Sequence, residues 1–297
     1  MKRVTWLLAL VGAVLLSACP VPADDLYVVV GARPAPGTKI TSLPYEIKTS
    51  GYYYLTGNLT NTNTGAGGGG ITVSANDVTL DLMGFTLTGP GSETGYLDGI
   101  LLTSDKINVE VRNGTVSGWY SGVEQYNGST GTHHRVIGIR ANGNTYGVWL
   151  GGSNHLIKGC TASQGTFGSG TGLHIAGTGT ISDSTVRGFS YNGIYIGGGK
   201  VSGNLVLNCP GKGIVASAVA TISDNSVSNC GAGTGNAGIS GAGGGSITGN
   251  AVLANTGQTG VLINNGNMFD QNSLSGAGTH WAFATGLTSW LWASNGY

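Results

Sequence analysis

Side chains able to do chemistry recur at intervals of about two dozen residues in the middle of the chain. Glu124, Trp149, His174 and Tyr195 follow one another at steps of 25, 25 and 21 residues. A carboxylate and an imidazole can exchange protons with a substrate, and aromatic rings stack on the apolar faces of sugars. These side chains can act together only if the fold places residues of the same step side by side.

A glycine followed by a large aliphatic residue repeats through the same region. The steps between the aliphatic residues are 23, 25, 25, 21, 20, 25 and 22 residues. Such a period is typical of one structural unit that is repeated by stacking and buries its apolar face against its neighbours. The pairs are Gly99-Ile100, Gly122-Val123, Gly147-Val148, Gly172-Leu173, Gly193-Ile194, Gly213-Ile214, Gly238-Ile239 and Gly260-Val261.

Two further apolar columns place a bend in every repeat, because the third column follows the second after 5 residues each time. Side chains alternate faces along a strand, so an odd gap between two inward residues requires a bend. Asparagine tolerates the left-handed backbone conformation, so we expect Asn204, Asn225, Asn250 and Asn272 to form the bend. The second column is Val111, Val136, Ile157, Ile181, Val201, Ile222, Ile247 and Phe269, and the third is Val116, Ala141, Ala162, Val186, Val206, Val227, Val252 and Leu274.

The repeats and the opening segments resemble the right-handed parallel β-helix proteins of the pectate-lyase-like superfamily. The segments are ITSLPYEIKTSGYYYLTGNLT (40–60), GITVSANDVTLDLMGFTLTG (70–89) and VEVRNGTVSGW (109–119). The resemblance spans about residues 40–274 and implies an all-β fold, a single-stranded right-handed parallel β-helix. We expect three short strands per turn and about nine or ten turns in residues 40–279. Residues 280–297, which include Trp281, Trp290 and Trp292, then form a C-terminal cap.

The N-terminus carries an export signal. Lys2 and Arg3 precede an apolar run that ends in Leu16-Ser17-Ala18-Cys19, which is the pattern of a secretory signal peptide. The last four residues resemble a bacterial lipobox, which implies cleavage after residue 18 and lipid on Cys19. Residues 19–39 are then expected to hold the lipidated N-terminus, a tether and the start of an N-terminal cap. The expected location is the bacterial cell envelope, anchored by lipid to the outer membrane or the cell surface. An ordinary signal peptide with a chance cysteine is the alternative.

Charge and cysteine content limit the partners. Without Lys2 and Arg3 the chain has 11 basic and 13 acidic side chains, which argues against nucleic acid as a partner. No Cys/His spacing indicates zinc, and no cofactor is identified, while calcium stays open as a ligand. Cys209 and Cys230 each follow the third column by three residues. They should stack on adjacent turns, either as a disulfide or as two buried thiols.

One vertical row of outward side chains is the candidate site. Glu124, Tyr126, Trp149, His174 and Tyr195 should cover about 15 Å over four turns. Glu124 and His174 are the candidate catalytic acid or base, and Tyr126, Trp149 and Tyr195 the candidate sugar-binding residues. Lys212 lies just before the next strand and could meet a carboxylate of the substrate. The alternative is a solvated sheet surface, since strands favour aromatic residues anyway.

Other polar residues argue less directly for a site. Asp98, Asp183, Asp224 and Asp270 fall in different columns, so no paired-acid motif is expected. Asp81 is interpreted as structural, and His133-His134-Arg135 as a long turn that binds metal or an anionic sugar, or is simply solvated.

The sequence leaves two functions open. The first is polysaccharide recognition, with cleavage by a lyase or hydrolase reaction as an added step. The second is a non-catalytic surface scaffold or adhesin with a protein partner of unknown identity.

The lipid anchor gives a direct prediction. Cys19→Ser should move the protein from the membrane fraction to the soluble fraction, because each buried CH₂ of an acyl chain contributes about 0.8 kcal/mol to anchoring. Cell fractionation and incorporation of a labelled fatty acid measure the change. Cys160→Ser, a cysteine of the repeat region, should keep the label, and label retained by Cys19→Ser would contradict the anchor.

Overall fold

The computed structural model describes residues 37–283, with short gaps at 66–68, 94, 127, 166–167, 233–234 and 277, and the strand at 291–292. The expected signal peptide, Cys19 with its tether, and most of the expected cap lie outside the described residues. Within this part of the chain, no helix has the length and apolar character needed to cross a membrane.

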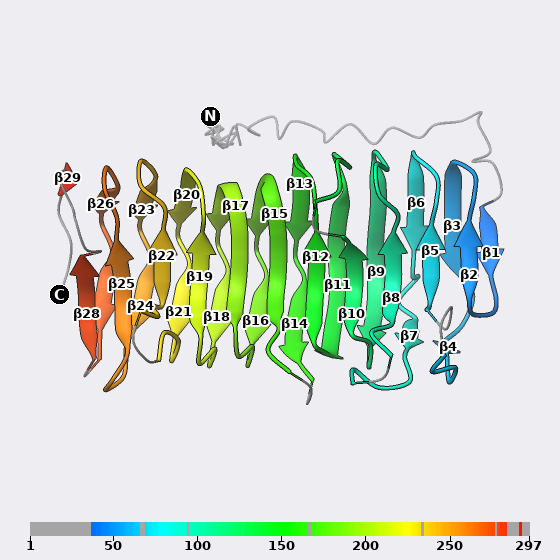
Figure 1. Cartoon of the computed structure of the whole chain (residues 1–297), viewed down its shortest axis with the longest axis horizontal. Coiled ribbons are helices and arrows are strands. Elements are labelled where there is room, and N and C mark those ends of the chain that lie inside the picture. Colours follow the sequence, from blue (N-terminus) through cyan, green and yellow to red (C-terminus); the bar gives the residue numbers. More distant parts are fainter. Residues whose placement is uncertain are drawn as a thin grey trace, which may run out of the picture. The chain divides into compact units, whose positions relative to one another are not determined.

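The described residues form a right-handed parallel β-helix of about ten turns, as the repeats predict (Figure 1). Three sheets run along its length. The first contains β2 (Tyr45–Ile47), β5 (Ile71–Val73), β8 (Asp98–Leu102), β10 (Ser121–Gln125), β12 (Tyr146–Leu150), β15 (Thr171–Ser182), β17 (Asn192–Ser202), β19 (Lys212–Ala216), β22 (Ile239–Gly241), β25 (Thr259–Ile263) and β28 (Thr279–Phe283). The second contains β1 (Thr38–Ile40), β3 (Gly51–Leu55), β6 (Val78–Asp81), β9 (Val109–Ser117), β11 (Arg135–Asn144), β13 (His155–Lys158), β20 (Ala220–Ser223), β23 (Ser246–Thr248), β26 (Met268–Asp270) and β29 (Leu291–Trp292). The third contains β4 (Leu59–Thr60), β7 (Thr86–Thr88), β14 (Thr161–Gln164), β16 (Thr185–Arg187), β18 (Leu205–Leu207), β21 (Ser226–Ser228), β24 (Ala251–Leu253) and β27 (Ser273–Ser275).

Some strands run through two sheets, so a turn does not always have three separate strands. β9 and β11 pass from the second sheet into the third, and β15 and β17 pass from the first into the second. Neighbouring turns pair in parallel throughout, which hydrogen-bonds the backbone of each turn to the next. The expected boundary at residue 280 falls inside β28, which pairs with β25.

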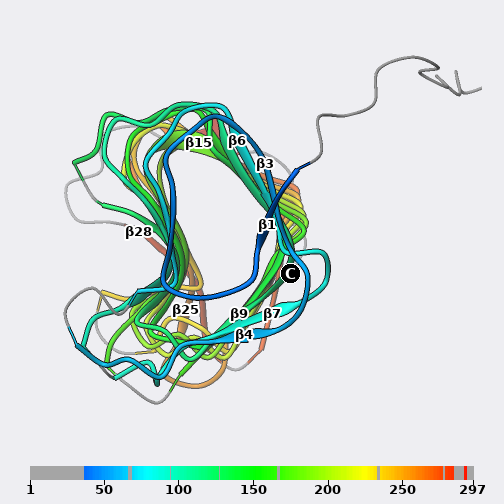
Figure 2. The same cartoon turned by 90° about the vertical axis from the view of Figure 1, so that its right-hand side faces the viewer.

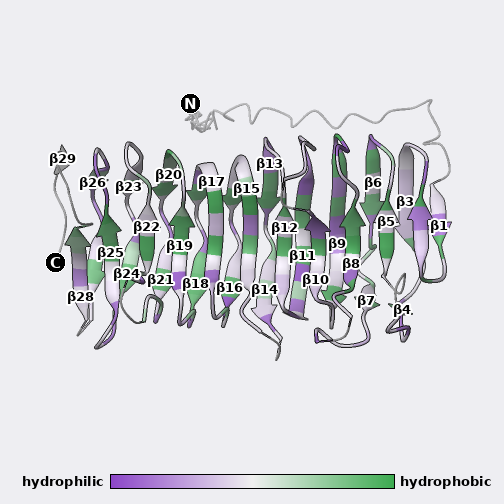
Figure 3. Ribbon diagram, viewed as in Figure 1, coloured by the Kyte–Doolittle hydropathy of each residue, from purple (hydrophilic) through white to green (hydrophobic). Residues whose placement is uncertain are grey.

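The three apolar columns predicted from the sequence lie in register and form the core. In the first sheet, for example, Val123 pairs with Ile100 on one side and Val148 on the other. Their side chains fill the interior of the solenoid and are fully buried. Hydrophobic residues recur on successive turns along the whole length (Figure 3), so the core is continuous from the first turn to the last.

The bend between the second and third columns is made differently from the expectation. The left-handed residue is the one before each asparagine: Gly203, Asp224, Gly249 and Gln271 have φ between 52° and 67°. The asparagine prediction is wrong in this respect because the left-handed residue turns the chain, and the next side chain then points into the corner. Asn204, Asn225, Asn250 and Asn272 are buried there.

These buried asparagines form a ladder. The Asn225 amide donates to the carbonyls of Val201 (3.0 Å) and Ser223 (2.9 Å) and to Oδ1 of Asn250 (3.0 Å). Its own Oδ1 accepts from the backbone N–H and the amide of Asn204, both at 3.0 Å. Each amide therefore satisfies backbone groups that the bend would leave unpaired in the interior.

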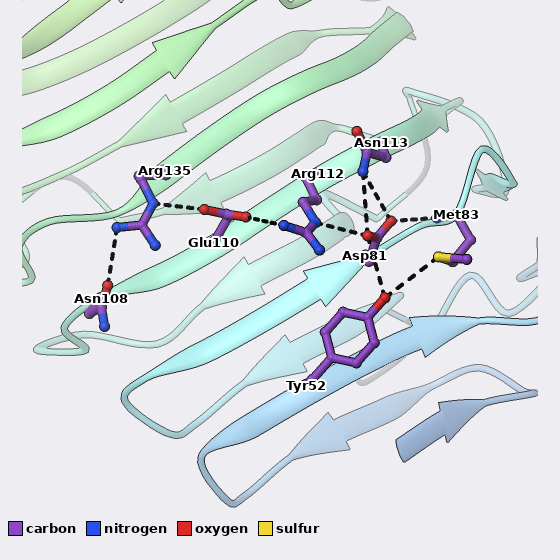
Figure 4. A network of polar contacts seen from close by, with 8 residues as sticks. All are labelled: Tyr52, Asp81, Met83, Asn108, Glu110, Arg112, Asn113 and Arg135. Atoms are coloured by element: carbon purple, nitrogen blue, oxygen red, sulfur yellow. Dashed lines mark hydrogen bonds and ion pairs between the residues drawn. The ribbon is translucent and has the colours of Figure 1, made fainter. Parts of the chain in front are cut away.

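A second polar network holds the early turns together (Figure 4). Asp81 on β6 accepts from Nε of Arg112 (2.8 Å) and from the N–H of Met83 (2.9 Å). Glu110 then bridges Arg112 (2.9 Å) and Arg135 (2.7 Å) across β9 and β11. Asp81 is buried and ties neighbouring turns together, which fits its expected structural role.

Cys209 and Cys230 stack on adjacent turns, as their spacing predicts. The N–H of Cys209 donates to Sγ of Cys230 at 3.3 Å. Both thiols are free and buried, so the structure has the second of the two alternatives, a pair of buried thiols.

The ladder predicts a large effect from a small change. Asn225→Ala leaves several buried backbone and amide groups without partners, each worth about 1–3 kcal/mol, so unfolding should need about 3 kcal/mol less free energy. Chemical denaturation followed by circular dichroism measures the loss. Ser226→Ala, the exposed neighbour on the same turn, is the control and should change stability little. Equal effects of the two substitutions would contradict the ladder's role.

Candidate functional site

The outer face of the first sheet carries the candidate residues. Seen along the solenoid axis, the wall that contains β25 and β28 bends inward, and loops extend beyond it on both sides (Figure 2). The register places Glu124 beside Trp149, Trp149 beside His174, and His174 beside Tyr195. The predicted vertical row therefore exists, with Leu101 before it and Val215 after it.

A second row lies beside the first, three residues earlier on each strand. The Ser121 hydroxyl donates to the carboxylate of Glu124, and the ring of Tyr146 lies 4.7 Å from that of Trp149. Both rows thus face the same side of the sheet. Lys212 belongs to this second row, in register with Asn192, and so lies one row away from the aromatic residues.

Aromatic rings form an unbroken ladder that begins at Tyr96 and Tyr120, beside the second row, and continues through both rows. Trp149 and His174 stack with centroids 4.8 Å apart and an angle of 18° between their planes. The remaining neighbouring centroids are separated by 4.7 Å for Tyr96–Tyr120, 5.3 Å for Tyr120–Tyr146, 4.7 Å for Tyr146–Trp149 and 4.4 Å for His174–Tyr195. Tyr96, Tyr120 and Tyr146 extend the surface beyond the predicted residues. They precede the repeat glycine of their turn by three, two and one residues, so the repeat spacing does not reveal them as one set.

Two nitrogens in this ladder are buried without a hydrogen-bond partner among the described residues: Nε1 of Trp149 and Nε2 of His174. Burial lowers the pKa of His174 to about 4, so its ring is neutral at neutral pH. His174 therefore offers a flat polar ring at that pH and no proton for acid catalysis.

Glu124 lies in a carboxyl pair with Asp98, which contradicts the expectation that no acids are paired. Both side chains are buried, and they come from neighbouring turns on β10 and β8. Burial raises the pKa of Asp98 to about 8, and the nearby Glu124 carboxylate adds to the shift because its charge and its acceptor oxygens favour the protonated form of Asp98. The pair was missed because its members lie in different rows. Asp98 stands just before Gly99, as Ser121 stands before Gly122, and this offset was the available signal.

A pocket of about 220 Å³ is lined by Asp98 of this pair. Tyr126 and Tyr96 flank it with 53% and 69% of their surfaces exposed. Tyr126 thus lies at the pocket instead of in the aromatic ladder, and burial and the nearby carboxyls raise the pKa of its hydroxyl, which keeps it a donor. Tyr96 has φ of 51°, a strained conformation for a bulky residue. The lining residues are Pro44, Gly69, Thr72, Tyr96, Leu97, Asp98, Leu101 and Tyr126.

His134 and His155 form a separate buried stack, with centroids 5.0 Å apart. The idea of a solvated turn is therefore wrong for His134, because the left-handed residue His133 turns the next side chain inward. Nδ1 of His134 accepts from the N–H of Val109 (3.2 Å), and its Nε2 faces the amide of Gln125 (3.0 Å).

The ring nitrogens of His155 are engaged in the same way. Nδ1 accepts from the N–H of His134 (3.1 Å), and Nε2 donates to the Gly151 carbonyl. Burial lowers the pKa of His134 to about 3 and that of His155 to about 4. All four ring nitrogens are thus taken up by contacts within the protein.

One solved structure resembles this chain in fold, and two others match it with lower TM-scores. A Dettilon tailspike protein is 15% identical with a TM-score of 0.56, and the match covers 83% of this chain and 60% of the tailspike chain. The A-modules of the Azotobacter vinelandii mannuronan C-5 epimerases AlgE4 and AlgE6 are 10% and 14% identical, with TM-scores of 0.41 and 0.39. Those matches cover 87% and 88% of this chain and 91% of each module. No curated protein matches the chain.

The family model described as periplasmic copper-binding protein (NosD) matches residues 73–286. Copper needs free imidazole, thiolate or thioether donors that converge. In residues 37–283, apart from the gaps, no three His, Cys, Asp or Glu side chains are grouped to hold a metal ion. Burial raises the pKa of the Cys160 thiol to about 11, and His134 and His155 have no free nitrogen, so these donors do not fit copper. The match nevertheless spans well over half of the 297 residues, and the chain belongs to the NosD family.

Proposed function

We propose that this chain is a cell-envelope protein that binds polysaccharide along the outer face of the first sheet. The observation that carries the proposal is the aromatic ladder from Tyr96 to Tyr195, which ends at a pocket lined by Tyr96 and by the Asp98 carboxyl. From Glu124 to Tyr195 the row spans about 15 Å at the usual strand spacing. That length accommodates several sugar units of an extended polymer.

The chemistry of the face suits sugars. Aromatic rings pack against the C–H groups of pyranoses, and Tyr146, Trp149 and Tyr195 are half-buried, so part of each ring is accessible. Ser121, Thr171 and Asn192 in the second row are buried and support the face from beneath. Pairing Trp149 and His174 leaves two buried nitrogens without partners, which costs stability. Features that lower stability occur most often at functional sites, and we propose that the function of this one is ligand binding.

The envelope location rests on two supports. The family is described as periplasmic, and the N-terminal sequence has the pattern of an export signal that ends at Cys19. The lipid anchor on Cys19 belongs to this proposal. A polysaccharide of the envelope or of its surroundings would then be the ligand within reach.

Cleavage is a second candidate function, favoured by the carboxyl pair. At neutral pH Asp98 holds a proton that it can give to a glycosidic oxygen, while Glu124 can take a proton from the attacking water, so that water is added across the bond. Glu124 is the charged neighbour that acts on the pKa of Asp98, so the two carboxyls titrate together. They would act as one acid–base unit that shares a proton.

The binding proposal is tested by Trp149→Ala. Loss of the central ring removes stacking area and should weaken binding of the best ligand from a glycan array by about tenfold or more, as removal of a buried aromatic anchor usually does. Isothermal titration calorimetry measures the affinity. Tyr54→Ala, an aromatic residue on the second sheet, is the control. Unchanged binding in Trp149→Ala, or no glycan bound at all, would favour the non-catalytic scaffold or adhesin.

The cleavage proposal has a pH signature. Release of reducing ends from the bound polymer should fall as pH rises through about 8, because Asp98 must be protonated to act as the acid. Glu124→Gln should lower the rate at least about 100-fold, as loss of a general base does, with binding kept. The control is Asp183→Asn, an exposed carboxyl in the bend after β15. Tight binding with no new reducing ends at any pH would leave the pair without a catalytic role.

A further inference from the structure

The pocket at the Asp98–Glu124 pair has a distinct charge environment. We propose that it accepts a sugar unit without a carboxylate, so that the ligand of this face is a neutral or amino-sugar glycan and not a polyuronate. The inference rests on the proposed polysaccharide binding and names the substrate class for that site.

The pocket lining offers nothing that would pair with an anionic sugar. Asp98 contributes the single carboxyl among the described lining residues, with Glu124 next to it, and no lining residue is basic. The other lining groups are hydroxyls, aromatic rings, aliphatic side chains and glycine backbone. A sugar hydroxyl can donate to the carboxyl pair and accept from the Tyr126 hydroxyl, which stays protonated.

Two lysines along the first sheet are engaged or distant. Lys48, two turns before β8, pairs with Glu46 at 3.1 Å. Lys212 lies five turns after Asp98, about 24 Å away at the usual strand spacing, which exceeds the Debye length of about 8 Å in physiological salt. Arg112 and Arg135 lie in the second sheet and are bound to Asp81 and Glu110.

A ligand carboxylate in this pocket would add a third carboxyl near Asp98 and Glu124, which already disfavour having two negative charges side by side. The charge of Glu124 is strong enough to help Asp98 keep its proton up to about pH 8. Like charges a few ångströms apart in a partly desolvated site repel strongly, and such repulsion is how sites reject close analogues. An uncharged or cationic sugar meets no such barrier.

The test uses ligand pairs that differ only in charge. Hexamers of galacturonate and glucuronate are compared with the same hexamers after chemical reduction of each carboxylate to a primary alcohol, by calorimetry at pH 7 with the full chain. The reduced form of at least one pair should bind about tenfold more tightly than its uronate form. In the double variant Asp98→Asn/Glu124→Gln the difference should shrink to within about threefold, because the repelling charge is gone.

Controls separate this inference from the binding proposal. Asp183→Asn, a carboxyl outside the first sheet, should leave the difference unchanged. A uronate form that binds as tightly as its reduced form, with binding lost in Trp149→Ala, would overturn the neutral-sugar inference and keep polysaccharide binding. If neither these hexamers nor amino-sugar hexamers bind, the inference and the binding proposal fail together. Thermal unfolding of the double variant verifies that it folds.

Discussion

The hydrogen-bonded register between successive turns is the constraint on which the rest of the structure depends. Each strand pairs in parallel with the equivalent strand of the next turn, so every side chain lies about 4.8 Å from its counterpart. The register lines up the aliphatic columns, the asparagine ladder and the aromatic row at once. Each side chain must therefore be compatible in size and charge with its counterparts on the two adjacent turns.

Stacking at this spacing favours some side chains and penalises others. Amides form hydrogen bonds between turns: Asn225 donates to one neighbour and accepts from another. Flat rings stack on one another, as Trp149 and His174 do. Carboxylates at this spacing are destabilised, because like charges repel one another in a buried setting. Asp98 is in register with Ser121 and meets Glu124 across two rows. Burial first, and then the charge of Glu124, raise the pKa of Asp98, which lies at the pocket that the aromatic ladder leads into.

The same repetition links stability to the proposed function. Rings at a regular spacing present a surface with a regular repeat. Such a surface suits the repeating units of a polymer better than a compact ligand. The site needs no special scaffold, because each turn adds one more outward side chain to a wall that the core already holds rigid. Family membership alone would have drawn attention to metal donors, but the histidines that are close together are committed to backbone and amide groups.

The sequence by itself determined the fold, the three core columns and the row from Glu124 to Tyr195, because all of these follow from periodicity along the chain. Tertiary structure alone decided what depends on side-chain direction at the bends and between rows. In the structure the left-handed residue is Asp224 and not Asn225. His134 points inward and stacks on His155, and Asp98 lies near Glu124. The physical reason is that a repeat fixes which residues share a level, whereas contacts between columns depend on backbone torsions that no spacing records.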